Sequence, residues 1–329
     1  MNRLATRPLL ACVLVAGGLT SSLCAQPLQY QPGSLLIYPL WMNQAGKGSL
    51  ISVTNTNGDR RVLANNFRRG DVNVHYFYIE QRNWRVFDRV ERLTPNDIFT
   101  VITADHNPEQ GEGFLYVVAE DPETELAIEF DYLIGKEVVV DMVGNVCYAT
   151  VAYSIQANRP TPYSITDVNG NGRAEFNNTE YVRFPDVLFV DSFMEQVPSG
   201  IIDELVLLTT LGQDFRVDLD WLIYNNREDV FSRTFSFVCW TKVRLDQISA
   251  VTMFPNLNGQ NPGGEARTGW ARVDGRVATN IYTGELVDDP PFIGAHISTI
   301  NAPPAILFQG MRLLHQDGYQ DGRSLPIRF

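Results

Sequence analysis

The sequence predicts an all-β fold in which two antiparallel β-sandwich domains follow one another along the chain. Short apolar segments with a period of two are separated by Gly-, Pro- and Asn-containing turns at intervals of about 8–12 residues, and no sustained 3.6-residue period interrupts them. The order and spacing of these segments returns in the second half of the chain. These two observations carry the prediction.

The stretch from Val72 to Ile102 shows the pattern most clearly. The apolar face of its first strand consists of Val72, Val74, Tyr76 and Tyr78. This is the period of two that a half-buried strand requires. A second strand follows, and a turn that contains Pro95 leads into a third, because proline presets φ for tight turns.

The remaining strands of the first domain follow from the same reasoning. In the segment Ser34–Trp41, Pro39 indicates an edge strand or a bulge, because proline cannot donate a ladder hydrogen bond. The full set of predicted strands is Ser34–Trp41, Ser49–Thr54, Val72–Ile79, Trp84–Leu93, Ile98–Ile102, Phe114–Ala119, Leu126–Ile134, Val138–Val140 and Cys147–Ser154.

The second half repeats this order. The matching segments are Glu204–Thr210, Phe215–Tyr224, Val230–Trp240, Val243–Val251, Thr268–Val273 and Phe292–Ile297. We therefore predict a first β-sandwich domain over residues 26–155, an Asn- and Gly-rich linker or insertion over 156–184, and a second β-sandwich domain over 185–329.

Residues 1–25 predict a cleaved signal peptide. Arg3 and Arg7 precede an apolar run that is too short for a stable membrane anchor, and small residues lead to Ala25. We expect an exported protein that is periplasmic, extracellular or at the cell surface, with no membrane span after removal of the signal. The formal net charge of −12 and the lack of any basic cluster exclude a nucleic-acid partner.

One part of the chain resembles a known group. The strand and turn motifs SLLIYP, LISVTNTN, VNVHYFYI, ERLTPNDIFTVIT, GFLYVVAED and FDYLIG lie between Ser34 and Gly135. They are similar to those of uncharacterised exported bacterial proteins that have immunoglobulin-like β-sandwich domains and no assigned activity. The resemblance implies an immunoglobulin-like fold for the predicted β-sandwich domains and export, and it carries over no catalytic residue.

A calcium loop is the best chemical candidate. Asp167, Asn169 and Asn171 supply oxygen atoms at the first, third and fifth positions of a loop, Gly172 follows at the sixth, and Glu175 stands at the ninth. The twelfth position, which normally closes the calcium shell with a bidentate carboxylate, is Asn178. Two interpretations stay open: a structural calcium site that stiffens the interdomain segment, and a plain Asn-Gly surface turn.

The mature chain keeps two cysteines, Cys147 and Cys239. Export permits a disulfide between them, which would tie the two predicted domains together. The alternative is a pair of free buried thiols that pack as small hydrophobic side chains. The sequence favours the free thiols, because the two cysteines occupy non-equivalent places in the two halves.

No catalytic constellation emerges from the sequence. Asp218 and Asp220 lie on one face of a strand, where two carboxylates suit glycoside hydrolysis, but their alternation with apolar residues is typical of a solvated strand face. The histidines have no metal-binding spacing, and no GxSxG motif occurs.

We therefore expect a secreted non-catalytic module with a structural, adhesion or recognition role, whose partner is an extracellular protein or a glycan. The alternative is a carbohydrate-binding or polysaccharide-acting protein. It depends on the many aromatic residues, which serve as sugar platforms when exposed and as core when buried. Those that bear on it are Tyr76, Phe77, Tyr78, Trp84, Trp221, Tyr224, Trp240 and Trp270.

Overall fold

The protein is nearly all β, with several antiparallel sheets, as the sequence predicts. The computed structural model describes residues 31–108, 111–143, 146–197, 200–253, 256–257, 267–302, 306–317 and 324–325. Within these ranges, no helix has the length and apolar character needed to cross a membrane.

The first half, residues 31–155, contains nine strands and one short helix. They are β1 (Leu35–Gln44), β2 (Lys47–Asn55), β3 (Val72–Glu80), β4 (Val86–Leu93), β5 (Ile98–Ile102), α1 (Thr103–His106), β6 (Gly111–Glu120), β7 (Leu133–Asp141), β8 (Val146–Val151) and β9 (Tyr153–Ile155).

A connecting segment with the short strand β10 (Ala174–Glu175), which pairs with β21 (Ser324–Leu325), leads to the second half, residues 187–317. The elements of the second half are β11 (Val187–Met194), β12 (Ile201–Thr209), β13 (Phe215–Asn225), β14 (Val230–Val238), β15 (Trp240–Arg244), α2 (Leu245–Ile248), the 3-10 helix η1 (Ala250–Thr252), β16 (Thr268–Asn280), β17 (Leu286–Asp288), β18 (Phe292–Ala302), β19 (Ile306–Leu313) and β20 (His315–Asp317).

The strand pairings of the two halves follow the same order. In the first half, one row of strands runs β4-β3-β6-β1-β9 and the other runs β5-β2-β7-β8, with the β1–β2 hairpin passing from one row to the other. In the second half, the rows run β14-β13-β16-β11-β20 and β15-β12-β18-β19. Each half thus has two rows of strands that present their inner faces to each other. In the first half the hairpin joins the two rows into one nine-stranded sheet, and in the second half the rows are separate sheets.

Irregularities in strand register also recur in the two halves. The β1–β6 register shifts between Tyr38 and Trp41, and the β11–β16 register shifts between Val190 and Phe193. The bulge at Pro39 confirms the second of the two alternatives that the sequence offers for this proline. A glycine pairs with the residue that follows each bulge, Gly113 with Trp41 and Gly269 with Phe193, and a Cβ at Gly113 would lie 1.9 Å from a backbone oxygen.

Three hydrophobic cores fill the molecule, and alternate residues of the central strands enter different cores. In β3, Tyr76 and Tyr78 point into the core of the first half, whereas Phe77 and Ile79 point out of it. In β12, Leu205 and Leu207 enter the core of the second half. Their neighbours Val206 and Leu208 enter the same shared core as Phe77 and Ile79.

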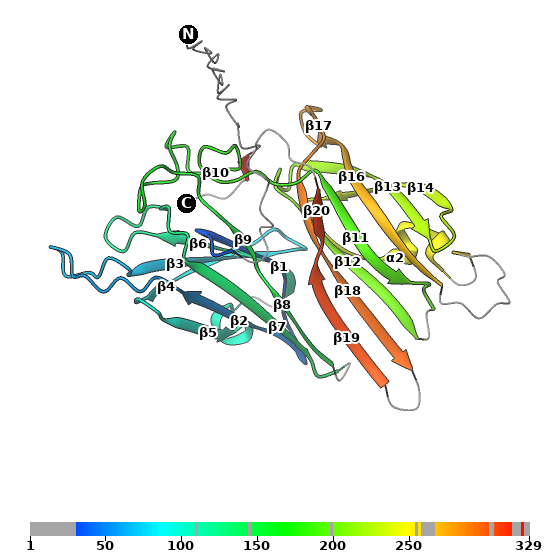
Figure 1. Ribbon diagram of the computed structural model, residues 1–329, viewed down its shortest axis with the longest axis horizontal. Coiled ribbons are helices and arrows are strands. Elements are labelled where there is room, and N and C mark those ends of the chain that lie inside the picture. Colours follow the sequence, from blue (N-terminus) through cyan, green and yellow to red (C-terminus); the bar gives the residue numbers. More distant parts are fainter. Residues whose placement is uncertain are drawn as a thin grey trace, which may run out of the picture.

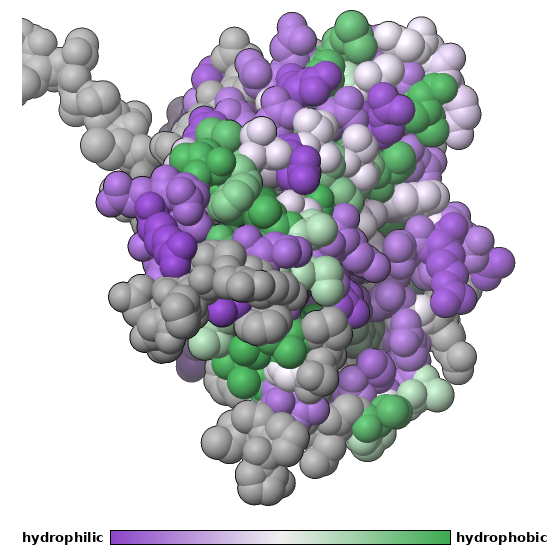
Figure 2. All heavy atoms as spheres, turned by 90° about the vertical axis from the view of Figure 1, so that its right-hand side faces the viewer, coloured by the Kyte–Doolittle hydropathy of each residue, from purple (hydrophilic) through white to green (hydrophobic). Residues whose placement is uncertain are grey.

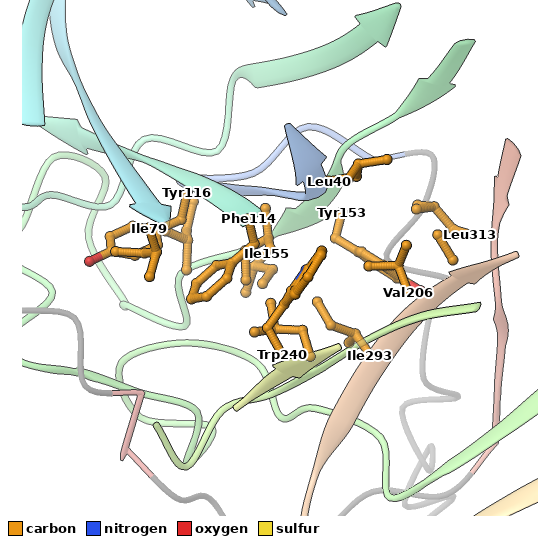
Figure 3. Packing of buried hydrophobic residues seen from close by; sticks show 14 of the residues in the cluster. Leu40, Ile79, Phe114, Tyr116, Tyr153, Ile155, Val206, Trp240, Ile293 and Leu313 are labelled. Atoms are coloured by element: carbon orange, nitrogen blue, oxygen red, sulfur yellow. The ribbon is translucent and has the colours of Figure 1, made fainter. Parts of the chain in front are cut away.

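This shared core joins the two halves sheet to sheet (Figures 1 and 3). The outer face of the β3-β6-β1-β9 row packs against the outer face of the β15-β12-β18-β19 row, so four layers of sheet enclose three cores. Trp240 lies in its middle and donates its indole N–H to the carbonyl of Pro39 at 2.7 Å. The Tyr153 hydroxyl donates to the carbonyl of Gly294 at 2.5 Å.

One predicted strand needs correction. The segment Leu126–Ile134 is not one strand: β7 begins at Leu133, and residues before it form isolated bridges from Ala127 and Ile128 to other segments. In the segment 156–184, predicted to be a linker or insertion, Phe176, Tyr181 and Phe184 are buried in the shared core.

Candidate functional site

The predicted calcium ligands come together in one loop that its own hydrogen bonds close. The two carboxylate oxygens of Asp167 accept from the backbone N–H groups of Asn171 and Gly172, at 3.1 and 2.8 Å. Gly170 and Gly172 have φ of 68° and 70°, the left-handed conformation that glycine adopts without strain. The backbone therefore follows the tight path that the sequence predicts.

Glu175 closes the other side of this loop. Its Oε1 accepts from the side-chain amides of Asn169 and Asn171 at 3.1 and 3.0 Å. Buried Glu180, two residues beyond the twelfth position, accepts from the backbone N–H groups of Val168 and Glu175. Burial raises the pKa of the Glu180 carboxyl, against these hydrogen bonds.

The loop thus satisfies its polar groups internally. Within the described ranges, no group of three or more His, Cys, Asp and Glu side chains forms a metal-binding cluster. A calcium ion here would depend on the amide oxygens of Asn169 and Asn171 beside the carboxylates of Asp167 and Glu175. Carboxylate and amide oxygens are a donor set that suits calcium.

The two cysteines are both free in the structure. Cys147 is exposed on β8, and Cys239 is buried in the shared core between β14 and β15. Burial raises the pKa of the Cys239 thiol. The candidate disulfide between Cys147 and Cys239 is therefore not formed in the structure.

Asp218 and Asp220 lie on the outer face of β13, where each accepts a hydrogen bond from the neighbouring strand. Ser236 donates to Asp218 at 2.6 Å, and Thr234 donates to Asp220 at 3.0 Å. The aspartates thus take part in cross-strand pairs on a solvated face, as the alternation in the sequence indicates.

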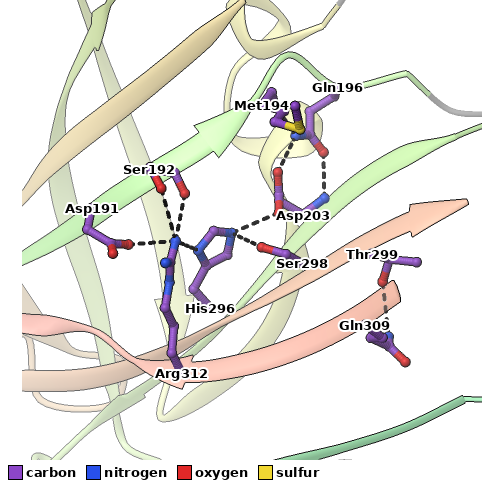
Figure 4. Close-up of polar contacts among 10 residues, drawn as sticks. All are labelled: Asp191, Ser192, Met194, Gln196, Asp203, His296, Ser298, Thr299, Gln309 and Arg312. Carbon is purple, nitrogen blue, oxygen red and sulfur yellow. Dashed lines mark hydrogen bonds and ion pairs between the residues drawn. The ribbon is translucent and has the colours of Figure 1, made fainter. Parts of the chain in front are cut away.

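A polar cluster surrounds His296, a strand histidine for which the sequence favours a structural role (Figure 4). The buried His296 on β18 contacts Asp203 of β12 through Nε2 at 3.0 Å and Arg312 of β19 through Nδ1 at 3.1 Å. Burial raises the pKa of Asp203, but the hydrogen bonds from His296, Ser298 and Gln196 outweigh this effect and the pKa is lowered.

This cluster differs from a hydrolase triad. A serine nucleophile and an aspartate bind opposite nitrogens of the triad histidine. Here Ser298 lies 3.3 Å from Nε2, the same nitrogen that contacts Asp203, while Nδ1 faces Arg312. The cluster therefore acts as a buried cross-strand brace within the β12-β18-β19 sheet.

The aromatic residues divide between core and surface. Trp221 and Trp240 are buried, in the core of the second half and in the shared core. Trp270 is 39% exposed on the outer face of β16 and stacks on Tyr224 of β13, with ring centroids 4.2 Å apart and an interplanar angle of 7°. The ring centroids of Phe189 of β11 and Trp270 are 6.2 Å apart. We call Phe189, Tyr224 and Trp270 the aromatic patch.

Figure 2 looks onto the side of the molecule that lies at the right of Figure 1, where β13, β14 and β16 are found. Hydrophilic residues interleave there with smaller hydrophobic areas. Arg272 and Asp274, which form an ion pair, lie on β16 beyond Trp270. The aromatic patch is therefore a small apolar area among charged residues.

The other outer sheet of the molecule carries an apolar groove of about 440 Å³. We call it the outer groove. Ile98 of β5, Ile134 of β7 and Val151 of β8 line it, all three exposed, and Lys136 is the charged residue of the lining that the structure describes. Gln31 lies at its margin.

Comparison with known proteins adds no assignment: no protein-family model matches this chain, and no curated protein matches its sequence.

Proposed function

We propose that this protein is an exported, non-catalytic module with a structural, adhesion or recognition role, built from two tandem immunoglobulin-like β-sandwiches. The signal-peptide features of residues 1–25 support export. The repeated order of strand pairing supports the tandem arrangement.

The strand order supports the immunoglobulin-like relation in its central pairs. If β2, β3, β5 and β6 correspond to strands B, C, E and F, the pairs β2–β5 and β3–β6 are the B–E and C–F pairs of that fold. The outer strands differ, because β1 lies beside β6 and β7 lies beside β2. The proposal is thus a sandwich of related design whose first and last strands have changed sheets.

The observation that carries the functional proposal is the shared core. Ligand sites often form at the junction of two domains. In this chain Trp240, Tyr153 and Ile293 fill that junction with packed side chains. A junction filled in this way holds two sandwiches at a fixed distance and angle, which suits a load-bearing or spacing element better than an enzyme that must open and close.

Carbohydrate binding is the second candidate, and the aromatic patch favours it. Trp270 is exposed, stands on a sheet face and is held by stacking on Tyr224. A ring fixed in this way presents a surface on which the C–H face of a sugar can pack.

Two measurements on residues 26–329 separate these candidates. The first is binding to an array of extracellular polysaccharides, with Trp270→Ala as the variant. The second is release of reducing sugar from the same polymers, with Asp218→Asn as the variant. Binding lost in Trp270→Ala, or hydrolysis lost in Asp218→Asn, would replace the non-catalytic structural proposal. Export is tested by expressing the whole chain in bacteria and sequencing the N-terminus of the exported product, which we expect to begin at Gln26.

A further inference from the structure

The two faces that join the halves inside the molecule have counterparts that are exposed at its two ends. The shared core forms between the outer face of the β3-β6-β1 row in the first half and the outer face of the β15-β12-β18 row in the second. The counterpart of the first face is the β13-β16-β11 row. The counterpart of the second face is the β5-β2-β7 row. These counterparts lie on opposite sides of the molecule (Figure 1).

The aromatic patch stands at the same register positions as the residues that the β3-β6-β1 row contributes to the shared core. Gly113 and Gly269 are equivalent, because each pairs with the residue that follows the bulge of its half. The residue after Gly113 is Phe114, which pairs with Ile79. The residue after Gly269 is Trp270, which pairs with Tyr224. Phe114, Ile79 and Trp240 belong to the shared core, so Trp270 and Tyr224 stand where residues of a second joint of this kind would be expected.

The residues of the outer groove stand at the same register positions as the residues around Trp240 on the other face of the shared core. In the second half, Leu208 pairs with Trp240 on one side and with Ile293 on the other. In the first half, Thr54 pairs in the same way with Ile98 and Ile134. The helices α1 and α2 confirm this alignment, because each begins directly after the strand that carries Ile98 or Trp240.

The sizes of the side chains are exchanged between the two faces. Inside the molecule, the large Trp240 comes from the β15 side and enters the shared core to which Phe114 belongs. At the free ends, the smaller Ile98 and Thr54 stand in the positions of Trp240 and Leu208, and the groove lies over them. The larger Trp270 stands in the position of Phe114. A small residue on one face and a large one on the other keep the two surfaces complementary.

Both faces also carry charged residues. Lys136 lines the outer groove. On the face of the aromatic patch, Asp220 and Asp274 pair across β13 and β16, and Arg276 and Arg272 lie 3.8 and 2.5 Å from their carboxylates. These arginines offset the acidic charge, so the match between the two faces depends on the shape of their apolar side chains.

We propose that this protein associates with a second copy of itself head to tail, with the aromatic patch of one copy packed into the outer groove of the next. The contact reproduces between molecules the sheet-to-sheet joint that already exists within the chain. It rests on the proposed structural role and gives that role a partner. Because the two surfaces differ, the contact is heterologous and leads either to a closed ring or to an open filament.

Sedimentation velocity of residues 26–329, from about 1 to about 200 µM, tests this inference in the range expected of a modest interface. We expect the sedimentation coefficient to rise with concentration. Trp270→Ala removes the centre of the patch, and Ile134→Lys places a charge in the groove. Each variant alone should remain a monomer with an unchanged melting temperature, since both residues are exposed. Tyr282→Ala, at an exposed tyrosine on the turn before β17, is the matched control and should associate normally.

A mixture of the two variants gives the decisive result. Ile134→Lys keeps an intact patch and Trp270→Ala keeps an intact groove, so a head-to-tail contact predicts a dimer in the mixture and nothing larger. Self-association of Trp270→Ala alone would overturn the proposal in favour of a groove-to-groove dimer. A monomer at every concentration would also overturn it. So would association that occurs only after deletion of residues 26–30, because the chain next to Gln31 would then be the occupant of the groove. A monomeric protein that neither binds nor hydrolyses polysaccharide leaves the structural proposal in place, so the two proposals fail independently.

Discussion

Glu137 on β7 has its carboxyl group in the interior of the first half. Its Oε1 accepts a hydrogen bond from Ser49 at 2.6 Å, and its Oε2 has no hydrogen-bond partner within the described residues. Burial raises the pKa of Glu137 to about 8, although the bond from Ser49 works in the opposite direction. A buried carboxyl group of this kind binds a proton in the folded protein that it has released in the unfolded chain.

The stability of the protein should therefore depend on pH through this residue. The folded-state pKa lies above the unfolded value near 4.5, so the stabilisation is complete below about pH 4.5 and is lost as the pH rises toward 8. The loss is on the order of 5 kcal/mol at most. We expect Glu137→Gln to flatten this slope in urea unfolding between pH 5 and pH 8. Ser52→Ala, on the opposite face of β2, is the control. An unchanged slope in Glu137→Gln would show that the carboxyl group is ionised in the fold.

The two cysteines offer a second prediction at this scale. Cys147 is exposed and Cys239 is buried with a raised pKa, and only a thiolate reacts rapidly with disulfide reagents. We expect one thiol to react with Ellman's reagent in the native protein and two after unfolding. Cys147→Ser should abolish the native reaction. Absence of a reactive thiol in native parent protein would indicate that Cys147 is covered or oxidised.

Among the elements, the Asp167 loop carries the calcium hypothesis. Asp167 accepts from two backbone N–H groups, so Asp167→Ala should lower stability whether or not calcium binds. The calcium-dependent part must be measured as a difference. If the loop is a site, calcium raises the melting temperature of the parent and not that of Asp167→Ala. Asp121→Ala is the matched control, because Asp121 also accepts from two backbone N–H groups in a turn. An equal response to calcium in parent and Asp167→Ala would show that the loop is a plain turn.

The elements also show how far the sequence alone can lead. The face of β3 formed by Val72, Val74, Tyr76 and Tyr78 enters the core of the first half, as its period of two predicts. The same strand buries Phe77 and Ile79 on its other side, because a sheet from the second half covers them. The local sequence could not predict that this second face is buried, because the sheet that covers it comes from a distant part of the chain.

The candidate surfaces have the same limitation. Trp240 and Trp270 are both strand tryptophans, yet one lies in the shared core and the other lies on an outer face. The difference depends on which sheet each strand joins and on which sheets meet, and both are properties of the whole fold. The turn of residues 167–175 could be predicted because Gly and Asn act locally, within a few residues. The groove over Ile98 and Ile134 could not, because β5 and β7 meet only through β2.

For the whole molecule, the shared core predicts that the two halves unfold together. Each half has its own core, and the joint between them buries Trp240, Tyr153 and Ile293. A large apolar joint of this kind couples the stability of the two halves, so calorimetry of the parent should show a single transition.

Trp240→Ala should uncouple the halves. It removes a large buried side chain from the joint and its hydrogen bond to Pro39, at a cost of about 3–5 kcal/mol. It leaves intact the cores that lie within each half, so we expect the single transition to separate into two. Trp221→Ala is the matched control, because Trp221 is equally buried but lies in the core of the second half. That variant should lower the melting temperature by a comparable amount without the same separation, since the joint is preserved. A single transition in Trp240→Ala, shifted no more than in Trp221→Ala, would mean that other contacts hold the halves together.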